Sequence, residues 1–256
     1  MEFRPCIDIH NGKVKQIVGA TLKDGGAAEN FVSEKGAAYF AKLYKKLGLA
    51  GGHVIILNRR DTPEYASSKR EALSALAAFE GGMMAGGGIN DENAGEFLDA
   101  GASHVIVTSF IFSDGELDVK KLERMKSAVG KDRLCIDLSC RKKDGRYYVV
   151  TDRWQRFSGS VLDEGLLEGL SDSCDEFLVH AADVEGRRAG IDEEVIGILK
   201  NSNVRVTYAG GVKDLSDIER VRTAGDGRVD VTVGSALDIF GGSIRIEEIA
   251  GIAAKK

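Results

Sequence analysis

Cys6-Ile7-Asp8, near the start of the chain, recurs as Cys135-Ile136-Asp137, a separation of 129 residues in a chain of 256. Each copy closes a short apolar run of the kind that forms a buried strand. A polar, glycine-containing stretch and a second β-rich run, residues 13–18 and 146–151, follow the two copies. A carboxylate at the end of a hydrophobic strand is costly to bury unless it is hydrogen-bonded or used in chemistry. The repeat therefore predicts one active site made by duplication of a half-domain.

Two further motifs repeat at nearly the same spacing. The first half carries AGGGI at residues 85–89 and VIVTS at 105–109, and the second carries YAGGV at 208–212 and VTVGS at 231–235. The glycine motifs are offset by 123 residues and the serines by 126. A period near half the chain is too long for a solenoid and indicates two half-domains.

Composition and charge favour one enzyme-sized domain, residues 1–256, with halves at about 1–130 and 131–256. The hydrophobic content of 43% is enough for a large core. No leader and no apolar run of about eighteen residues occurs, which favours the cytoplasm over secretion or a membrane. The net charge of −5 argues against a nucleic-acid partner. The four cysteines form no CxxC pair, so neither a metal site nor a disulfide framework is expected.

Strand-like and helical patterns alternate along the chain. The expected strands are 3–9, 53–57, 83–86, 104–108, 133–138, 176–180, 205–208 and 230–233. The expected helices are 36–46, 68–79, 92–100, 118–129, 162–170, 193–200, 215–223 and 246–254. Eight β/α units predict a parallel sheet closed into a (β/α)8 TIM barrel with an internal half-barrel repeat. An open doubly wound sheet is the structural alternative, but it does not account for the matching halves.

Asp8 and Asp137 fall at the carboxyl ends of the first and fifth expected strands, where a barrel of this type carries its active site. They would stand on opposite sides of the mouth, as a general acid and a general base flanking one substrate. The alternative is that each carboxylate caps a loop or pairs with a nearby base such as Lys13 or Arg141.

The glycine-rich turns indicate phosphate binding. Backbone N–H groups at glycines approach an anion closely, and a following helix N-terminus adds partial positive charge. The turns predict two phosphate sites, one at Gly87-Gly88 with Ser109 and one at Gly210-Gly211 with Gly234-Ser235. A side chain at Gly211 is expected to weaken binding and leave the fold intact, because the turn lies at the mouth. Tight βα turns without a ligand are the alternative reading.

Six segments together resemble one family, the phosphoribosylformimino-aminoimidazole carboxamide ribotide isomerases of histidine biosynthesis, and its branch typical of eukaryotes. The similarity runs over almost the whole chain. The segments are CIDIHNGKVKQ at 6–16, GGHVI at 51–55, AGGGINDENA at 85–94, IDLSCRKKDGRYYVVTDRWQ at 136–155, HAADVEG at 180–186 and YAGGVKDLSDI at 208–218.

The resemblance implies an Amadori rearrangement of an aminoaldose that carries a phosphate at each end, without metal, organic cofactor or obligate protein partner. An acid protonates the ribose ring oxygen and opens the ring, and a base then removes the proton on the adjacent carbon. The resemblance implies Asp8 as the base, with Asp137 opposite it.

The chain departs from bacterial relatives in three places. The loop at 182–187 lacks their Arg-Asp-Gly, whose aspartate is a candidate acid, so the acid is either Asp137 or Asp183. Ser109 follows a threonine where Gly-Thr is common, which leaves the donors to that phosphate open. The second strand ends in Asn58 where an acidic residue is common. Trp154, the only tryptophan, either stacks on the substrate or packs within its loop.

Three other functions compete with the isomerase. The cyclase of imidazole glycerol phosphate synthase shares the repeat, the phosphate sites and the two aspartates, but the segment around Trp154 favours the isomerase. A non-catalytic phosphosugar-binding barrel is disfavoured because both aspartates are present. A metal-dependent epimerase is disfavoured because paired strand-end histidines are absent.

Overall fold

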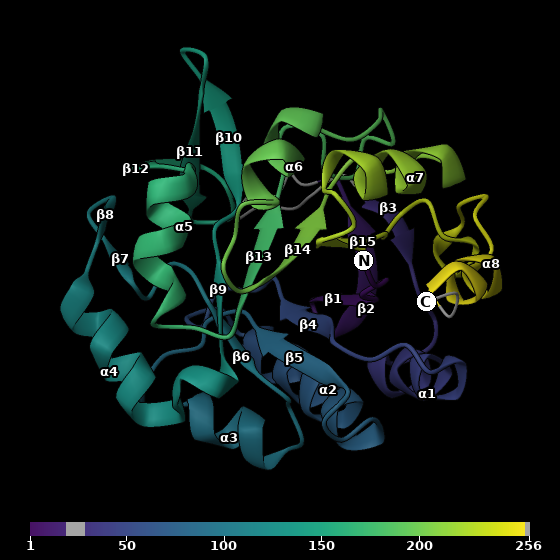
Figure 1. Cartoon of the computed structure of the whole chain (residues 1–256). Coiled ribbons are helices and arrows are strands. Elements are labelled where there is room, and N and C mark those ends of the chain that lie inside the picture. Colours follow the sequence, from purple (N-terminus) through teal and green to yellow (C-terminus); the bar gives the residue numbers. More distant parts are fainter. Residues whose placement is uncertain (19–28, 254–256) are drawn as a thin grey trace.

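The computed structural model describes residues 1–18 and 29–253. Its central feature is a curled sheet in which neighbouring barrel strands run parallel, in the order β15-β14-β13-β9-β6-β5-β4-β1 (Figure 1). The barrel strands are β1 (Cys6–His10), β4 (Gly52–Ile56), β5 (Met83–Gly86), β6 (Val105–Val107), β9 (Leu134–Asp137), β13 (Glu176–His180), β14 (Arg205–Ala209) and β15 (Val229–Thr232).

The residues before β1 close the sheet against β15. Phe3 forms a parallel bridge with Val231, the Arg4 N–H donates to the Val231 carbonyl at 2.9 Å, and the Val231 N–H donates to the Glu2 carbonyl at 3.0 Å. The sheet thus has no free edge between its first and last barrel strands, which is the arrangement of a (β/α)8 barrel. The fold class predicted from the sequence is confirmed.

Helices cover the outside of the barrel between its strands (Figure 1). Four of them begin at an aspartate whose carboxylate accepts a backbone N–H of the first turn, which satisfies a donor that the helix itself leaves open. These caps are Asp118, Asp163, Asp192 and Asp214. The helices are α1 (Ala37–Leu47), α2 (Tyr65–Ala78), α3 (Ala94–Asp99), α4 (Val119–Val129), α5 (Glu164–Ser171), α6 (Glu193–Leu199), α7 (Leu215–Ala224) and α8 (Ile246–Ala253).

The barrel interior is filled by side chains and is no channel. A buried apolar cluster separates the two ends and consists of Met84, Ile106, Cys135 and Leu178. At the amino end of the strands the buried Arg4 guanidinium donates to Asp230, at 3.0 and 3.1 Å. This buried ion pair occupies the amino end of the barrel.

Antiparallel strands follow the first strand of each half. β1 continues into β2 (Lys13–Ile17) and β3 (Glu29–Val32), while β9 continues into a separate sheet of β10 (Cys140–Lys143), β11 (Arg146–Thr151) and β12 (Arg156–Val161). The hairpin of β10 and β11 stands out from the barrel (Figure 1). A smaller hairpin, β7 (Phe112–Ser113) with β8 (Glu116–Leu117), follows β6. Both larger extensions grow from the strands that carry the repeated aspartates.

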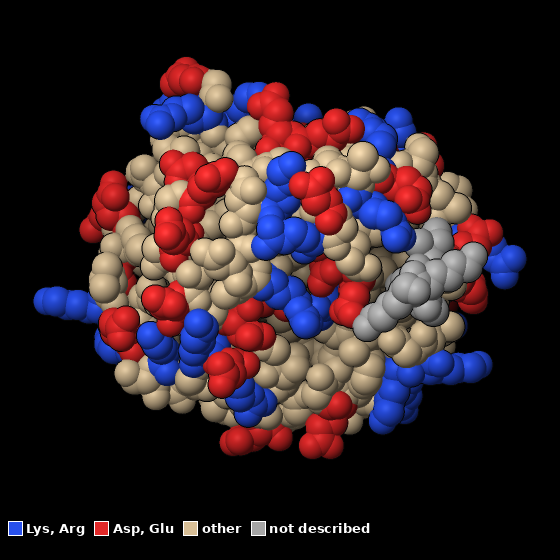
Figure 2. All heavy atoms as spheres, viewed as in Figure 1, with Lys and Arg blue, Asp and Glu red and all other residues tan. Residues whose placement is uncertain are grey.

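The predicted barrel strands and helices are all present, with ends shifted by a few residues. The largest shifts are of three residues, at the start of the predicted strand 3–9, since β1 begins at Cys6, and at the start of the predicted helix 68–79, since α2 begins at Tyr65. The last residue of the predicted helix 246–254 lies outside the described residues. Acidic and basic side chains are mixed over the face seen in Figure 2. Within the described residues, no helix is long and apolar enough to cross a membrane.

Candidate active site

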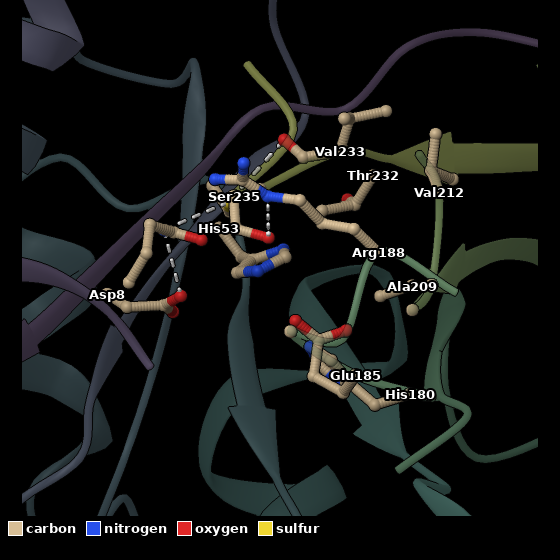
Figure 3. Close-up of a pocket in the computed structure, with 16 residues that line it drawn as sticks. Asp8, His53, His180, Glu185, Arg188, Ala209, Val212, Thr232, Val233 and Ser235 are labelled. Atoms are coloured by element: carbon tan, nitrogen blue, oxygen red, sulfur yellow. Dashed lines mark hydrogen bonds between the residues drawn. The ribbon is translucent and has the colours of Figure 1, made fainter. Parts of the chain in front are cut away.

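A pocket opens at the carboxyl ends of the barrel strands (Figure 3). Charged and ring side chains from distant parts of the sequence line it: Asp8, His53, His180, Glu185 and Arg188. The turns that follow β14 and β15 line the same pocket through Gly210, Gly211, Gly234 and Ser235. Because barrels of this type carry their active sites at this end, the pocket is the candidate active site.

Asp8 points into the pocket from β1. Its Oδ2 accepts a hydrogen bond from Nε2 of Gln16 on β2, at 3.3 Å, so the hairpin after the first strand orients the carboxylate. Burial raises the pKa of Asp8 to about 7, and the Gln16 amide opposes that shift only in part. A carboxylate with this pKa is suited to take a proton near neutral pH.

Glu185 is a candidate functional residue that sequence analysis missed. It lies on the loop between β13 and α6 and lines the pocket together with Asp8. Burial, and then the negative charge of Asp8, raise the pKa of Glu185 to about 7. Glu185 therefore keeps its proton to a higher pH than an exposed glutamate does. In Glu185-Gly186 an acidic residue precedes a glycine, as in the Arg-Asp-Gly of bacterial relatives. This similarity was the signal in the sequence that could have identified Glu185 as a candidate acid.

The loop that carries Glu185 is anchored on two sides. The Gly186 carbonyl accepts from Nδ2 of Asn30 on β3, at 3.0 Å. The Gly190 N–H donates to the Gly211 carbonyl at 2.9 Å. These contacts join the loop to an extension of the first half and to a turn of the second. They determine that Glu185 faces the pocket.

Asp183, on the same loop, lies outside the pocket lining. Its carboxylate accepts from Nε of Arg141 and from the backbone N–H of Lys142, both at 2.9 Å. The side chain thus ties the loop to β10. The structure does not bring Asp183 together with Asp8.

Asp137, the last residue of β9, also lies outside the pocket lining. Its Oδ1 accepts from the backbone N–H of Ser139 at 2.7 Å and from the Ser139 hydroxyl at 2.5 Å. The Ser139 Oγ in turn lies 3.2 Å from Nδ1 of His180, which does line the pocket. Asp137 therefore reaches the pocket through two intervening side chains.

The two predicted phosphate sites differ in their surroundings. Gly210, Gly211, Gly234 and Ser235 line the pocket, and Nε of Arg188 donates to the Ser235 hydroxyl at 3.4 Å (Figure 3). Gly87, Gly88 and Ser109 lie outside this pocket lining, and the exposed Ser109 hydroxyl accepts the Asp152 N–H at 3.5 Å. Only the second-half site is continuous with the Asp8 and Glu185 pocket.

Gly211 is needed by the fold as well as by any ligand. Its φ is +75°, and a Cβ added there would lie 2.0 Å from the Gly190 carbonyl oxygen. Gly87 has the same requirement, because its Cβ would lie 2.1 Å from the Ile56 carbonyl oxygen. The expectation that a side chain at Gly211 leaves the fold intact is wrong, since it would push the Glu185 loop away.

Trp154 lies in the turn between β11 and β12. Its ring centroid is 5.3 Å from that of His180, at an interplanar angle of 42°. Three consecutive residues of this turn, Asp152, Arg153 and Trp154, have φ between +51° and +64°, a left-handed conformation that costs free energy in residues other than glycine. The turn therefore holds the indole beside a pocket residue, at the edge of the site where a ligand would enter.

Within residues 1–18 and 29–253, no group of three histidine, cysteine or carboxylate side chains is arranged to hold a metal ion. His53 and His180 meet edge to face, with ring centroids 5.7 Å apart. Burial, and then the positive charge of a protonated His180, lower the pKa of His53 to about 3.

Comparison with known proteins identifies the family. The family model described as "Histidine biosynthesis protein" matches residues 2–245. The chain belongs to this family. The resemblance found in the sequence motifs is confirmed.

Three curated relatives carry the name 1-(5-phosphoribosyl)-5-((5-phosphoribosylamino)methylideneamino) imidazole-4-carboxamide isomerase. The relative from Medicago truncatula, named as chloroplastic, is 54% identical over 97% of this chain and 80% of its own length. The relative from Yarrowia lipolytica is 46% identical over 94% and 93%, and that from Saccharomyces cerevisiae 44% identical over 95% and 94%. These names support the isomerase over the cyclase and over the non-catalytic barrel.

Proposed function

We propose that this chain catalyses the isomerisation named for its relatives, an Amadori rearrangement of an aminoaldose with two phosphoribosyl groups. The observation that carries the proposal is the Asp8 and Glu185 pair, which shares one pocket with the glycine turns at 210–211 and 234–235. An acid and a base beside a phosphate site are what ring opening and proton abstraction on a phosphosugar require.

Glu185 is the acid in this proposal. The charge of Asp8 keeps Glu185 protonated after Asp8 has ionised, because it raises the pKa of Glu185. Glu185 gives its proton to the ribose ring oxygen, the bond from that oxygen to the anomeric carbon breaks, and a protonated Schiff base forms. This assignment replaces Asp137 and Asp183 as the acid.

Asp8 is the base. It removes the proton from the carbon next to the Schiff base, and the electron pair of the broken C–H bond forms an enolamine. Return of that proton to the former anomeric carbon, with loss of the hydroxyl proton, gives the aminoketose. Gln16 holds the carboxylate in place through its hydrogen bond to Oδ2. The reaction moves protons only, so the proposal includes no metal and no organic cofactor.

The two ends of the substrate bind at the two halves of the barrel. One phosphate lies at Gly210, Gly211, Gly234 and Ser235, next to the Arg188 guanidinium. The other lies at Gly87, Gly88 and Ser109, and Trp154 covers the span between them. We infer the cytoplasm as the compartment, although one relative is named as chloroplastic.

The test is an absorbance assay of the purified chain on the bisphosphate aminoaldose, after dialysis against a chelator and without ammonia. Turnover under these conditions is the expected result. No turnover, or turnover only with added metal, would reject the proposal. No turnover of the aminoaldose, together with production of imidazole glycerol phosphate from the aminoketose and ammonia, would assign the chain to the cyclase instead.

A further inference from the structure

A line of hydrogen bonds runs from Asp137 to the pocket. The Ser139 hydroxyl donates to Asp137 Oδ1 at 2.5 Å, and the same oxygen lies 3.2 Å from Nδ1 of His180. The His180 backbone N–H also donates to this oxygen, at 3.4 Å. His180 is the last residue of β13, and its ring lines the pocket with Asp8 and Glu185.

The direction of these bonds determines which nitrogen of His180 carries the proton. A hydroxyl has one hydrogen, and Ser139 gives that hydrogen to the carboxylate. Its oxygen can then only accept from His180, so Nδ1 bears the hydrogen of the neutral imidazole. Nε2 is left with a lone pair. Burial lowers the pKa of His180, with the Asp137 charge opposing, which favours this neutral form.

The ring has little freedom to turn away from the pocket. Trp154 lies on one side, with centroids 5.3 Å apart, and His53 meets it edge to face at 5.7 Å. His180 lines the same pocket as Glu185 and Asp8 (Figure 3). An acceptor nitrogen is thus held in the pocket that contains both carboxyl groups.

The proposed reaction requires one proton to travel from the substrate to Glu185. Glu185 loses its proton to the ring oxygen, and Asp8 carries its proton from one carbon to the next and ends as it began. When the enolamine becomes the ketone, the hydroxyl on the second carbon must lose a proton. A group in the pocket that accepts this proton and gives it to the Glu185 carboxylate would complete the cycle.

We propose that His180 is that group. Its Nε2 accepts the hydroxyl proton while the O–H electron pair forms the carbonyl, the C=C pair takes the proton held by Asp8, and the imidazolium passes its proton to the Glu185 carboxylate. Every proton is then accounted for, and all three side chains return to their starting states. Asp137 and Ser139 are positioning residues that act through the His180 ring. The inference rests on the proposed isomerase function.

The first test separates deprotonation from ketone formation. His180→Gln is expected to lower kcat about 10²-fold with KM changed less than threefold. Exchange of the substrate C2 hydrogen with deuterated solvent needs ring opening by Glu185 and deprotonation by Asp8 but not His180, and it should continue faster than turnover in this variant. Normal turnover in His180→Gln would overturn the inference, as would an equal loss of exchange and turnover. Wild-type protein with neither exchange nor turnover would instead reject the isomerase function.

The second test addresses Ser139 and also serves if His180→Gln fails to fold. The chain has four histidines, so ¹⁵N-histidine labelling gives a resolvable set of imidazole signals by NMR. Wild type should show His180 protonated at Nδ1. Ser139→Ala should lose this fixed tautomer and about tenfold in kcat, and Ser139→Thr, which keeps the hydroxyl, should restore both. A wild-type signal for hydrogen on Nε2, or unchanged kcat in Ser139→Ala, would overturn the inference.

Discussion

The two copies of Cys-Ile-Asp end in aspartates with different surroundings. Asp8 accepts one amide hydrogen bond, from Gln16, and faces Glu185 in the pocket. Asp137 accepts two hydrogen bonds from Ser139 and lies outside the pocket lining. The cause is local, because β9 ends at Asp137 and turns, which brings the N–H two residues on to the carboxylate. β1 instead runs on to His10, so no turn captures Asp8.

The two proposed phosphate sites, one in each half, also differ in their surroundings. The second-half site has the Arg188 guanidinium at Ser235 and joins the Asp8 and Glu185 pocket, whereas the first-half site has an exposed serine. In the proposed function the acid and the base therefore lie beside the second-half site. The comparison teaches that repeated residues predict equivalent positions and not equivalent roles.

The largest expected difference between the halves is in kcat. Asp8→Asn removes the base with little change of shape, and kcat should fall by about 10²–10⁴-fold. Asp137→Asn weakens the two hydrogen bonds that Ser139 donates, and kcat should fall by roughly tenfold. Steady-state kinetics on both variants measures the contrast. Equal losses would mean that the two aspartates have equivalent roles.

The acid assignment gives a pH dependence. Below pH about 7 Asp8 gains a proton and can no longer act as base, and above pH about 7 Glu185 loses the proton it must donate. The wild-type kcat/KM should therefore be bell-shaped with its maximum near pH 7. Glu185→Gln should lose about 10²-fold in activity and also lose the decline at high pH. Retention of the alkaline limb in this variant would assign the acid to another residue.

Charge placed at the phosphate sites tests whether the substrate has two phosphates. Ser109→Asp and Ser235→Asp each set a carboxylate against a bound phosphate, which should raise KM by about 10–100-fold. The effect should be smaller at Ser235, because Arg188 neutralises part of the new charge. The matched neutral controls are Ser109→Asn and Ser235→Asn. A KM increase at only one site would contradict a bisphosphate substrate.

The smallest expected effect is on stability. The folded pKa of Asp8 is raised from 3.8 to about 7, so between these pH values the folded chain holds a proton that the unfolded chain has released. The free energy of unfolding therefore falls as pH rises through this interval, and the loss is complete above pH 7. Asp8→Asn should raise the free energy of unfolding by about 1–2 kcal/mol at pH 8, a value reduced because the Asp8 side chain is partly exposed to solvent. Urea unfolding at pH 8 and pH 5 measures this, and a gain no larger at pH 8 would refute it.

The parts predictable from sequence are those that local patterns specify. Apolar runs of strand length predict the barrel strands, and Asp8 follows because it interrupts such a run. The short strands β7 and β8 were missed, because a strand of two residues is too short to show an alternation of apolar and polar side chains. Glu185 was missed because its direction depends on its loop, and that loop is held by Asn30, 156 residues away from Gly186 in sequence. Contacts of this range leave no local pattern.

Closure of the barrel by residues 2–4 onto β15 has a consequence for synthesis on the ribosome. Arg4 and its partner Asp230 are 226 residues apart, and a ribosome adding about 5–20 residues per second needs roughly 10–45 s to cover that distance. During this time residues 2–4 lack their partner strand β15, and the Arg4 guanidinium lacks Asp230. β1 can pair with β4 early, but residues 2–4 can pair only after the last barrel strand has been made, so the nascent chain must keep these opening residues free of other pairings until then.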